Sequence, residues 1–361
     1  MGKKSKAIEY KIAVTRTSEK DATGSILLIY TGGTIGMIKD ESGSLVPFNF
    51  NAALQKVPEL SQMHLKMTMV SFPVLLDSSS IRIEDWQSLG TIIHENYDQY
   101  DGFVILHGTD TMAYTASALS YMLEGLRKPV VLTGAQIPIG ELRSDARENL
   151  VAALQIASAK EAGVPIVQEV TIYFNFVLLR GNRSQKVRSS TFGAFESANY
   201  PELAKSGIFI EYNKPNLLKT KKSDTLTLRA KFEPNVLILK VFPGLNEQAL
   251  RCILGMEGLK GIVLETFGSG NTMTYDWFID ALKETIDRGV VVYNVSQCSG
   301  GEVIPGRYAA SKRLMDIGVV SGGDITSEAA ITKLMFLLAN GRNAVDIKRK
   351  LELPLRGEMD T

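Results

Sequence analysis

Apolar runs of five or six residues alternate along the chain with stretches in which apolar residues recur every three or four positions. Near-continuous Val, Ile and Leu runs are typical of parallel strands covered on both faces, and the longer spacing is typical of helices. The sequence therefore predicts an α/β protein built on parallel sheets. The expected strands are 25–30, possibly 72–76, 102–106, 129–133, 170–174, 236–241, 261–265 and 290–294, with helices at about 112–124 and 149–161 and after each of the last three strands.

The apolar rhythm is interrupted between Lys214 and Pro234 by a polar stretch rich in lysine. We place a linker there, in which the alternation of Thr225–Leu228 suggests a short edge strand. A chain of 361 residues at about 150 residues per domain agrees with two α/β domains, the larger one N-terminal. The expected segments are an N-terminal extension at 1–24, a domain at 25–213, the linker at 214–234 and a domain at 235–361.

The composition excludes several classes of protein. Forty basic and thirty-nine acidic side chains give a net charge of +1, which disfavours a dedicated nucleic-acid binder. Two cysteines and three histidines (His64, His94 and His107) are too few for a disulfide framework or a typical zinc site, and a Ser-His-Asp triad would need one of those histidines. Neither a targeting signal nor an apolar run of about 18 residues is present. We expect a cytoplasmic protein with no metal, nucleic-acid or membrane partner.

Open α/β sheets bind ligands beyond the carboxyl ends of their strands. The first strand leads into Thr31–Gly36, where glycines expose backbone amides beside two threonine hydroxyls. The spacing does not fit the Gly-x-Gly-x-x-Gly dinucleotide motif, and the Gly-Lys-Ser/Thr end of a phosphate loop is missing. The alternative is a tight turn without function.

Two further strand exits are polar. His107–Thr111 precedes an expected helix, so Asp110 and Thr111 could simply cap that helix. Asp77–Ser80 follows the possible strand at 72–76 and could likewise be a cap. Because carboxyl ends of parallel strands share one edge of a sheet, these exits together indicate a site.

A basic segment follows the strand at 170–174. A lysine held beside a threonine and an aspartate could act as a base, whereas a solvated loop is the alternative. Spacing does not choose among its four cations, which are Arg180, Arg183, Lys186 and Arg188.

These motifs closely resemble those of the bacterial-type L-asparaginases, in particular the cytoplasmic type I branch. The resemblance runs from about Ser25 to the C-terminus and leaves residues 1–24 outside it. The matching strings are Tyr30–Met37, Asp77–Ser79, Leu106–Tyr114, Thr133–Pro138, Arg180–Arg183 and Ala329–Leu334.

The resemblance implies a two-domain hydrolase that converts L-asparagine to L-aspartate and ammonia without a cofactor, as a homodimer or homotetramer. It makes Thr34 the nucleophile, with Thr109, Asp110 and Lys186 as the second catalytic group. The implied substrate contacts are Asp77, Ser78, Ser79, Thr109, Asp110 and the backbone of Ala135.

Two departures from the family pattern affect the mechanism. The family has a tyrosine in the loop after the first threonine motif, and the nearest position here is Ser44. Some cytoplasmic members bind asparagine at an allosteric pocket through an arginine, a threonine and a cysteine. The aligned residues here are Glu265, Ser296 and Cys298; because Glu265 reverses the arginine's charge, we do not predict that regulation, and we expect Cys298 to be a packed thiol.

Other functions stay open at this stage. The same fold serves glutaminases and the amidase subunit of tRNA-dependent amidotransferases, although the latter would need a longer N-terminal module. A sensor that binds an amino acid without turnover is the alternative from another class, and the missing loop tyrosine favours it. Release of ammonia separates an enzyme from a sensor.

Overall fold

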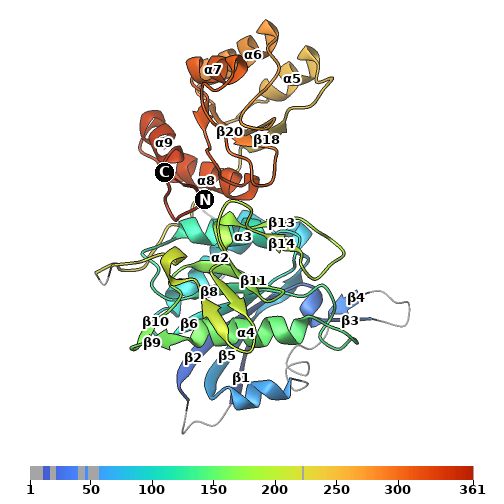
Figure 1. Cartoon of the computed structure of the whole chain (residues 1–361), viewed down its shortest axis with the longest axis vertical. Helices are drawn as coiled ribbons and strands as arrows, with labels where there is room; N and C mark the ends of the chain where they lie inside the picture. Colours follow the sequence, from blue (N-terminus) through green and yellow to red (C-terminus); the bar gives the residue numbers. More distant parts are fainter. Residues whose placement is uncertain (1–10, 17–21, 40–44, 48–56, 222, 361) are drawn as a thin grey trace, which may run out of the picture.

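The computed structural model describes residues 11–16, 22–39, 45–47, 57–221 and 223–360. It contains two α/β domains, one above the other in Figure 1, and this confirms the predicted fold class. Each domain is built on its own sheet. Among the described residues, no helix has the length and apolar character needed to cross a membrane.

The larger sheet has nine strands in the order β1-β5-β2-β6-β8-β11-β12-β15-β16. Its five central strands are parallel and include every strand predicted for this domain. The strands on either side of them are antiparallel. In sheet order the strands are Lys11–Arg16, Leu65–Leu76, Gly24–Gly32, Gly102–Leu106, Val130–Thr133, Val170–Phe174, Val177–Arg180, Ala204–Ser206 and Ile210–Tyr212.

Strand β1 lies in the segment that sequence analysis treated as an extension. It runs antiparallel to β5, with Lys11 opposite Ser71 and Arg16 opposite Lys66. The extension therefore contributes an edge strand, which the sequence pattern did not predict.

Alternate side chains of β2 face two different helix layers, as expected for a strand buried on both sides. Leu27 and Ile29 pack with α2 (Ile83–Glu95) and α3 (Met112–Met122). Ile26, Leu28 and Tyr30 pack with α4 (Ala146–Ser158) on the other face (Figure 1).

The smaller sheet consists of four parallel strands in the order β18-β19-β20-β21, so its predicted strands are also present. Helices α8 and α9 cover the face nearer the N-terminal domain, and α8 packs on α3 within one hydrophobic core that both domains share (Figure 1). The bounds are β18 Val236–Lys240, α5 Glu247–Leu254, β19 Gly261–Thr266, α6 Asp276–Asp287, β20 Val291–Ser296, α7 Ala309–Asp316, β21 Val320–Ser321, α8 Ser327–Asn340 and α9 Ala344–Leu351.

The remaining strands and the 3-10 helices are short. In the linker, β17 pairs with β7 and belongs to neither main sheet. The short strands are β3 Met37–Lys39, β4 Leu45–Pro47, β7 Leu123–Glu124, β9 Lys160–Glu161, β10 Val164–Pro165, β13 Gln185–Lys186, β14 Phe195–Glu196 and β17 Thr227–Leu228. The 3-10 helices are η1 Thr34–Gly36, η2 Pro58–Gln62, η3 Ser78–Ser80, η4 Gly181–Arg183 and η5 Lys214–Asn216.

Candidate active site

The exits of β2 and β6 lie against each other. Gly33 has φ +88°, and a Cβ atom added to it would lie 2.5 Å from the amide nitrogen of Gly108, so the two backbones touch where neither residue has a side chain. The hydroxyl of Thr31 donates to the carbonyl of Leu106 at 3.0 Å and holds the same two strands together. Thr34 and Thr109, each one residue further along, are therefore placed on neighbouring loops at one edge of the sheet.

The exit of β5 joins them. Asp77 caps η3 by accepting from the amide of Ser79 at 3.0 Å. The buried side chain of Ser78 lies against Gly108, and its carbonyl accepts from the hydroxyl of Thr111 at 2.7 Å. Asp77 and Ser79 are exposed.

The simpler capping interpretation of His107–Thr111 is wrong. No side chain caps the N-terminus of α3. Thr111 instead bonds the carbonyl of Ser78, and Asp110 pairs with a lysine. The polar side chains at this exit are therefore used for contacts between loops.

The lysine is Lys186. Its Nζ donates to the hydroxyl of Thr109 at 2.8 Å and to Oδ1 of Asp110 at 2.5 Å. The Lys186 side chain is 16% exposed and that of Asp110 is 62% exposed, so the pair opens to solvent on the aspartate side. The structure thus brings together three of the four residues expected to be catalytic, and Thr34 lies on the neighbouring loop.

Lys186 does not directly follow a strand that ends at the site. Because β12 is antiparallel to β11, it ends at the opposite edge of the sheet, where Gly181 lies against the carbonyl of Val170. The chain then passes Ala116 of α3 and returns along that helix to its N-terminus. Sequence spacing contains no signal for this return.

The other three cations of the basic segment bind elsewhere. Arg183 binds Asp324 and Asp360, and Arg188 binds Glu196. Arg180 forms a buried pair with Glu169 at 2.7 Å.

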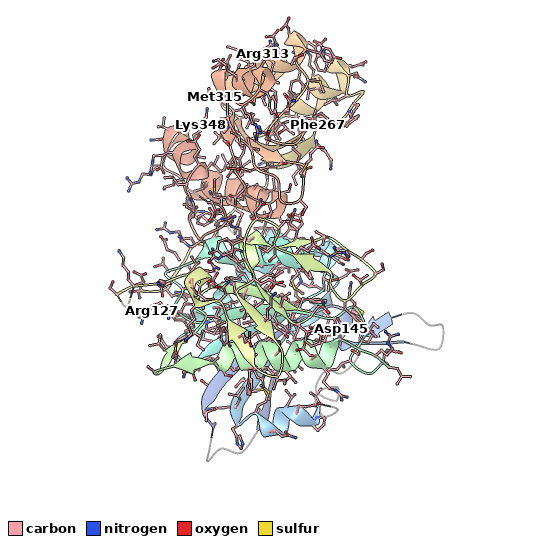
Figure 2. The ribbon with its side chains drawn as sticks, in the orientation of Figure 1. Arg127, Asp145, Phe267, Arg313, Met315 and Lys348 are labelled. Atoms are coloured by element: carbon pink, nitrogen blue, oxygen red, sulfur yellow. The ribbon has the colours of Figure 1, made fainter. Side chains whose placement is uncertain are left out.

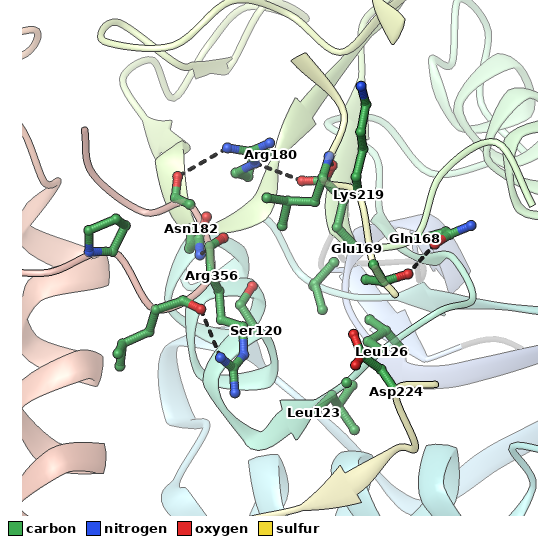
Figure 3. A pocket seen from close by; sticks show the side chains of 17 residues that line it. Ser120, Leu123, Leu126, Gln168, Glu169, Arg180, Asn182, Lys219, Asp224 and Arg356 are labelled. Carbon is green, nitrogen blue, oxygen red and sulfur yellow. Dashed lines mark hydrogen bonds and ion pairs between the residues drawn. The ribbon is translucent and has the colours of Figure 1, made fainter. Parts of the chain in front are cut away.

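The Arg180–Glu169 pair lines a cavity of about 420 Å³ (Figure 3). This cavity lies at the amino end of β11 and is bordered by Leu218 from the linker and Arg356 from the C-terminal segment. It is therefore separate from the threonine site at the opposite edge of the sheet.

Residues beyond β8 form the remaining wall of the site. Ala135 is buried. The amide of Gln136 donates to the carboxylate of Asp145 at 3.0 Å, and the side chain of Gln136 lies 3.5 Å from the hydroxyl of Thr109 and donates to the carbonyl of Thr191. Asp145 precedes α4 in the N-terminal domain (Figure 2). Gln136 belongs to the Thr133–Pro138 motif, and no role was predicted for it.

His107 does not serve a catalytic triad. It is fully buried, and burial lowers the pKa of its imidazole to about 4, so the ring is neutral at ordinary pH. Nδ1 lies 2.6 Å from the carbonyl of Gly108 and Nε2 lies 2.9 Å from the hydroxyl of Thr115. Since a carbonyl accepts only from N–H, we assign the proton to Nδ1. The ring thus links the backbone of Gly108 to Thr115 of α3.

The residues at the aligned allosteric position are held within the C-terminal domain. Glu265 accepts from the hydroxyl of Ser327 at 2.6 Å, and the hydroxyl of Ser296 donates to the carbonyl of Gly268. The expectation of a packed thiol is wrong, because Cys298 is exposed on the turn after β20. Ser44 lies outside the described residues.

Comparison with known proteins agrees with this geometry. Residues 25–218 match the family model "Asparaginase, N-terminal" and residues 235–351 match "Glutaminase/Asparaginase C-terminal domain". L-asparaginase 1 of Escherichia coli K12 is 41% identical over 337 residues, covering 93% of this chain and 98% of that protein.

Solved structures give the same result. L-asparaginase I of Vibrio cholerae superposes with a TM-score of 0.85 at 40% identity, covering 94% of this chain and 99% of that one. A probable cytoplasmic L-asparaginase of Campylobacter jejuni has a TM-score of 0.75 at 26% identity, covering 91% and 99%.

Proposed function

The chain belongs to the asparaginase family and is an amidohydrolase, and we propose that Thr34 is the nucleophile with which it hydrolyses L-asparagine. The enzyme releases L-aspartate and ammonia in two steps. The hydroxyl oxygen of Thr34 attacks the side-chain amide carbon, the C–N bond breaks, and the proton from the hydroxyl leaves with the nitrogen as ammonia. Water then cleaves the acyl-threonine ester and regenerates Thr34.

The contact that supports this proposal is the hydrogen bond of Lys186 to Thr109, with Asp110 on the same amine. Lysine, aspartate and threonine form a connected path along which a proton can move without a histidine. Thr109, on the loop next to Thr34, is placed to orient the water of the second step. The three residues thus act as one proton-handling group.

A free amino acid carries a carboxylate and an ammonium on its α-carbon, so the site must offer donors and acceptors. The carboxylates of Asp77 and Asp110 are acceptors for the ammonium group. The hydroxyls of Ser78 and Ser79 are donors for the carboxylate, and the backbone of Ala135 closes the wall beyond β8. Backbone amides of the strand exits are the donors for the oxyanion that develops during attack.

Ammonia release tests the proposal. We expect hydrolysis of L-asparagine well above L-glutamine, and a fall in kcat of about 10³-fold or more in both Thr34→Ala and Thr109→Val. Thr91→Val is the matched control, because its hydroxyl bonds only the carbonyl of Gln87 within α2 among the contacts of the described residues. Wild-type turnover in Thr34→Ala would remove the nucleophile assignment.

The same assay separates the alternative functions. Glutamine is one methylene longer than asparagine, which is worth about 1–3 kcal/mol or roughly 10–200-fold in kcat/KM, so a glutaminase would favour glutamine by up to that ratio. Absence of ammonia from either, with asparagine still raising the melting temperature, would identify a sensor.

Assembly and location belong to the same proposal. We infer a homodimer or homotetramer, which light scattering coupled to gel filtration would measure. We also infer a cytoplasmic enzyme, since a structural relative bears that description, and cell fractionation would test it.

A further inference from the structure

We propose that Gln185 and Glu328 are positioning residues: the hydrogen bond between them lets the C-terminal domain fix the orientation of the strand that carries Lys186. This inference rests on the proposed catalytic role of Lys186.

Gln185 is held by the C-terminal domain at both ends of its amide. Its Nε2 donates to Oε2 of Glu328 at 3.1 Å, and the hydroxyl of Ser299 donates to its Oε1 at 3.4 Å. Gln185 directly precedes Lys186 in β13, and successive side chains of a strand point to opposite faces. Fixing Gln185 on one face therefore fixes the rotation of the strand and the direction of Lys186 on the other.

The backbone of the strand is supported by a short hairpin, in which the amides of Val187 and Arg188 also donate to the carbonyl of Ala194. β13 is two residues long and pairs with the equally short β14, and an isolated ladder of this size is marginal in water. The preceding turn is held firmly, because buried Arg183 bonds the carbonyl of Gly357 at 2.8 Å and also binds Asp324. Ser184 follows, with its buried hydroxyl bonded to the carbonyl of Arg180 at 2.7 Å. Gln185 is the anchor adjacent to the lysine.

The acceptor lies on a helix that packs against the helix following the groups that Lys186 must reach. Glu328 lies in the first turn of α8, where the helix dipole favours a carboxylate. Helix α8 packs along α3, and the N-terminus of α3 follows Thr109 and Asp110. The Gln185–Glu328 bond thus ties the lysine to the frame that holds its partners.

The test is steady-state kinetics on L-asparagine with the full chain. Gln185→Ala and Glu328→Ala should each lower kcat roughly tenfold with KM within about twofold, because a misplaced amine affects the reacting geometry more than binding. Glu328→Gln keeps an acceptor oxygen at the same reach and should recover kcat to within about twofold of wild type. The double alanine variant should be no slower than Gln185→Ala, since that variant already removes the contact with Glu328.

Tyr121→Phe is the matched control. It removes a different hydrogen bond to α8, from the Tyr121 hydroxyl of α3 to the carbonyl of Ala329 at 3.2 Å, and that carbonyl keeps a bond from Thr332. Its kcat should equal that of wild type. Circular dichroism and the melting temperature confirm that each variant is folded.

Three results would overturn the inference. These are wild-type kcat in both alanine variants, an equal fall in Tyr121→Phe, and a Glu328→Gln enzyme as slow as Glu328→Ala. Lys186→Ala separates this inference from the proposed function. If Lys186→Ala keeps full turnover, the catalytic assignment fails and takes the positioning role with it; if it is inactive while both alanine variants are normal, the positioning role alone is wrong.

Discussion

Acid should destabilise the fold through His107. Burial lowers the pKa of this imidazole to about 4 from an ordinary value of 6.5. In the unfolded chain the ring takes up a proton below pH 6.5, whereas the folded protein resists protonation until about pH 4. The resulting stability is fully present above pH 6.5, falls as the pH drops, and levels off below about pH 4. At pH 5 the loss relative to pH 8 is about 2 kcal/mol, and the complete loss is about 3 kcal/mol.

Urea unfolding at pH 8, 6 and 5, at one protein concentration, measures this effect in wild type and in His107→Asn. Asparagine keeps an N–H donor for the carbonyl of Gly108 but does not titrate. The stability of wild type over the variant should shrink by about 2 kcal/mol between pH 8 and pH 5. His94→Asn, at an exposed position of α2, is the control for exchanging a histidine that is not buried. A stability difference that stays constant with pH would refute the buried neutral imidazole.

Three further outcomes follow from the packing. Gly33→Ala should abolish asparagine hydrolysis in the ammonia assay, because its φ is +88° and its Cβ would lie 2.5 Å from the backbone of Gly108. Arg180→Met should lower the free energy of unfolding in urea by about 3–5 kcal/mol, because it leaves the carboxylate of Glu169 buried and unpaired. Asp145→Ala removes the acceptor for two backbone amides of the Gln136 loop. We expect a several-fold rise in KM for asparagine, and an unchanged KM would contradict the anchoring role.

The strands at the centre of both sheets could be predicted because burial on both faces leaves uninterrupted apolar runs. Strand β1 could not, because this edge strand is held by a neighbour about 50–60 residues away in sequence, and nothing local in residues 11–16 indicates that pairing. The antiparallel direction of β12 could also not be predicted from the sequence. It depends on a tight hairpin at Asn175 and Phe176, both of which have positive φ.

The same limit applies to the site. Convergence of the threonine loops follows from parallel strands sharing one edge, so Thr34 and Thr109 were accessible to sequence reasoning. The choice of Lys186 over its basic neighbours was not, because it depends on where the other cations go. Arg183 is taken up by Asp324 and Asp360, and these carboxylates lie more than 140 positions further along the chain. Only the family resemblance could name the lysine in advance.

The core shared by α3 and α8 has a consequence for synthesis. About 200 residues separate the end of α3 from the start of α8, so the apolar face of α3 that α8 covers stays open while the rest of the first domain, the linker and most of the second domain are translated. At about 5–20 residues per second, that interval is roughly 10–40 seconds. The N-terminal domain therefore leaves the ribosome with an exposed surface, open to chaperones and to self-association.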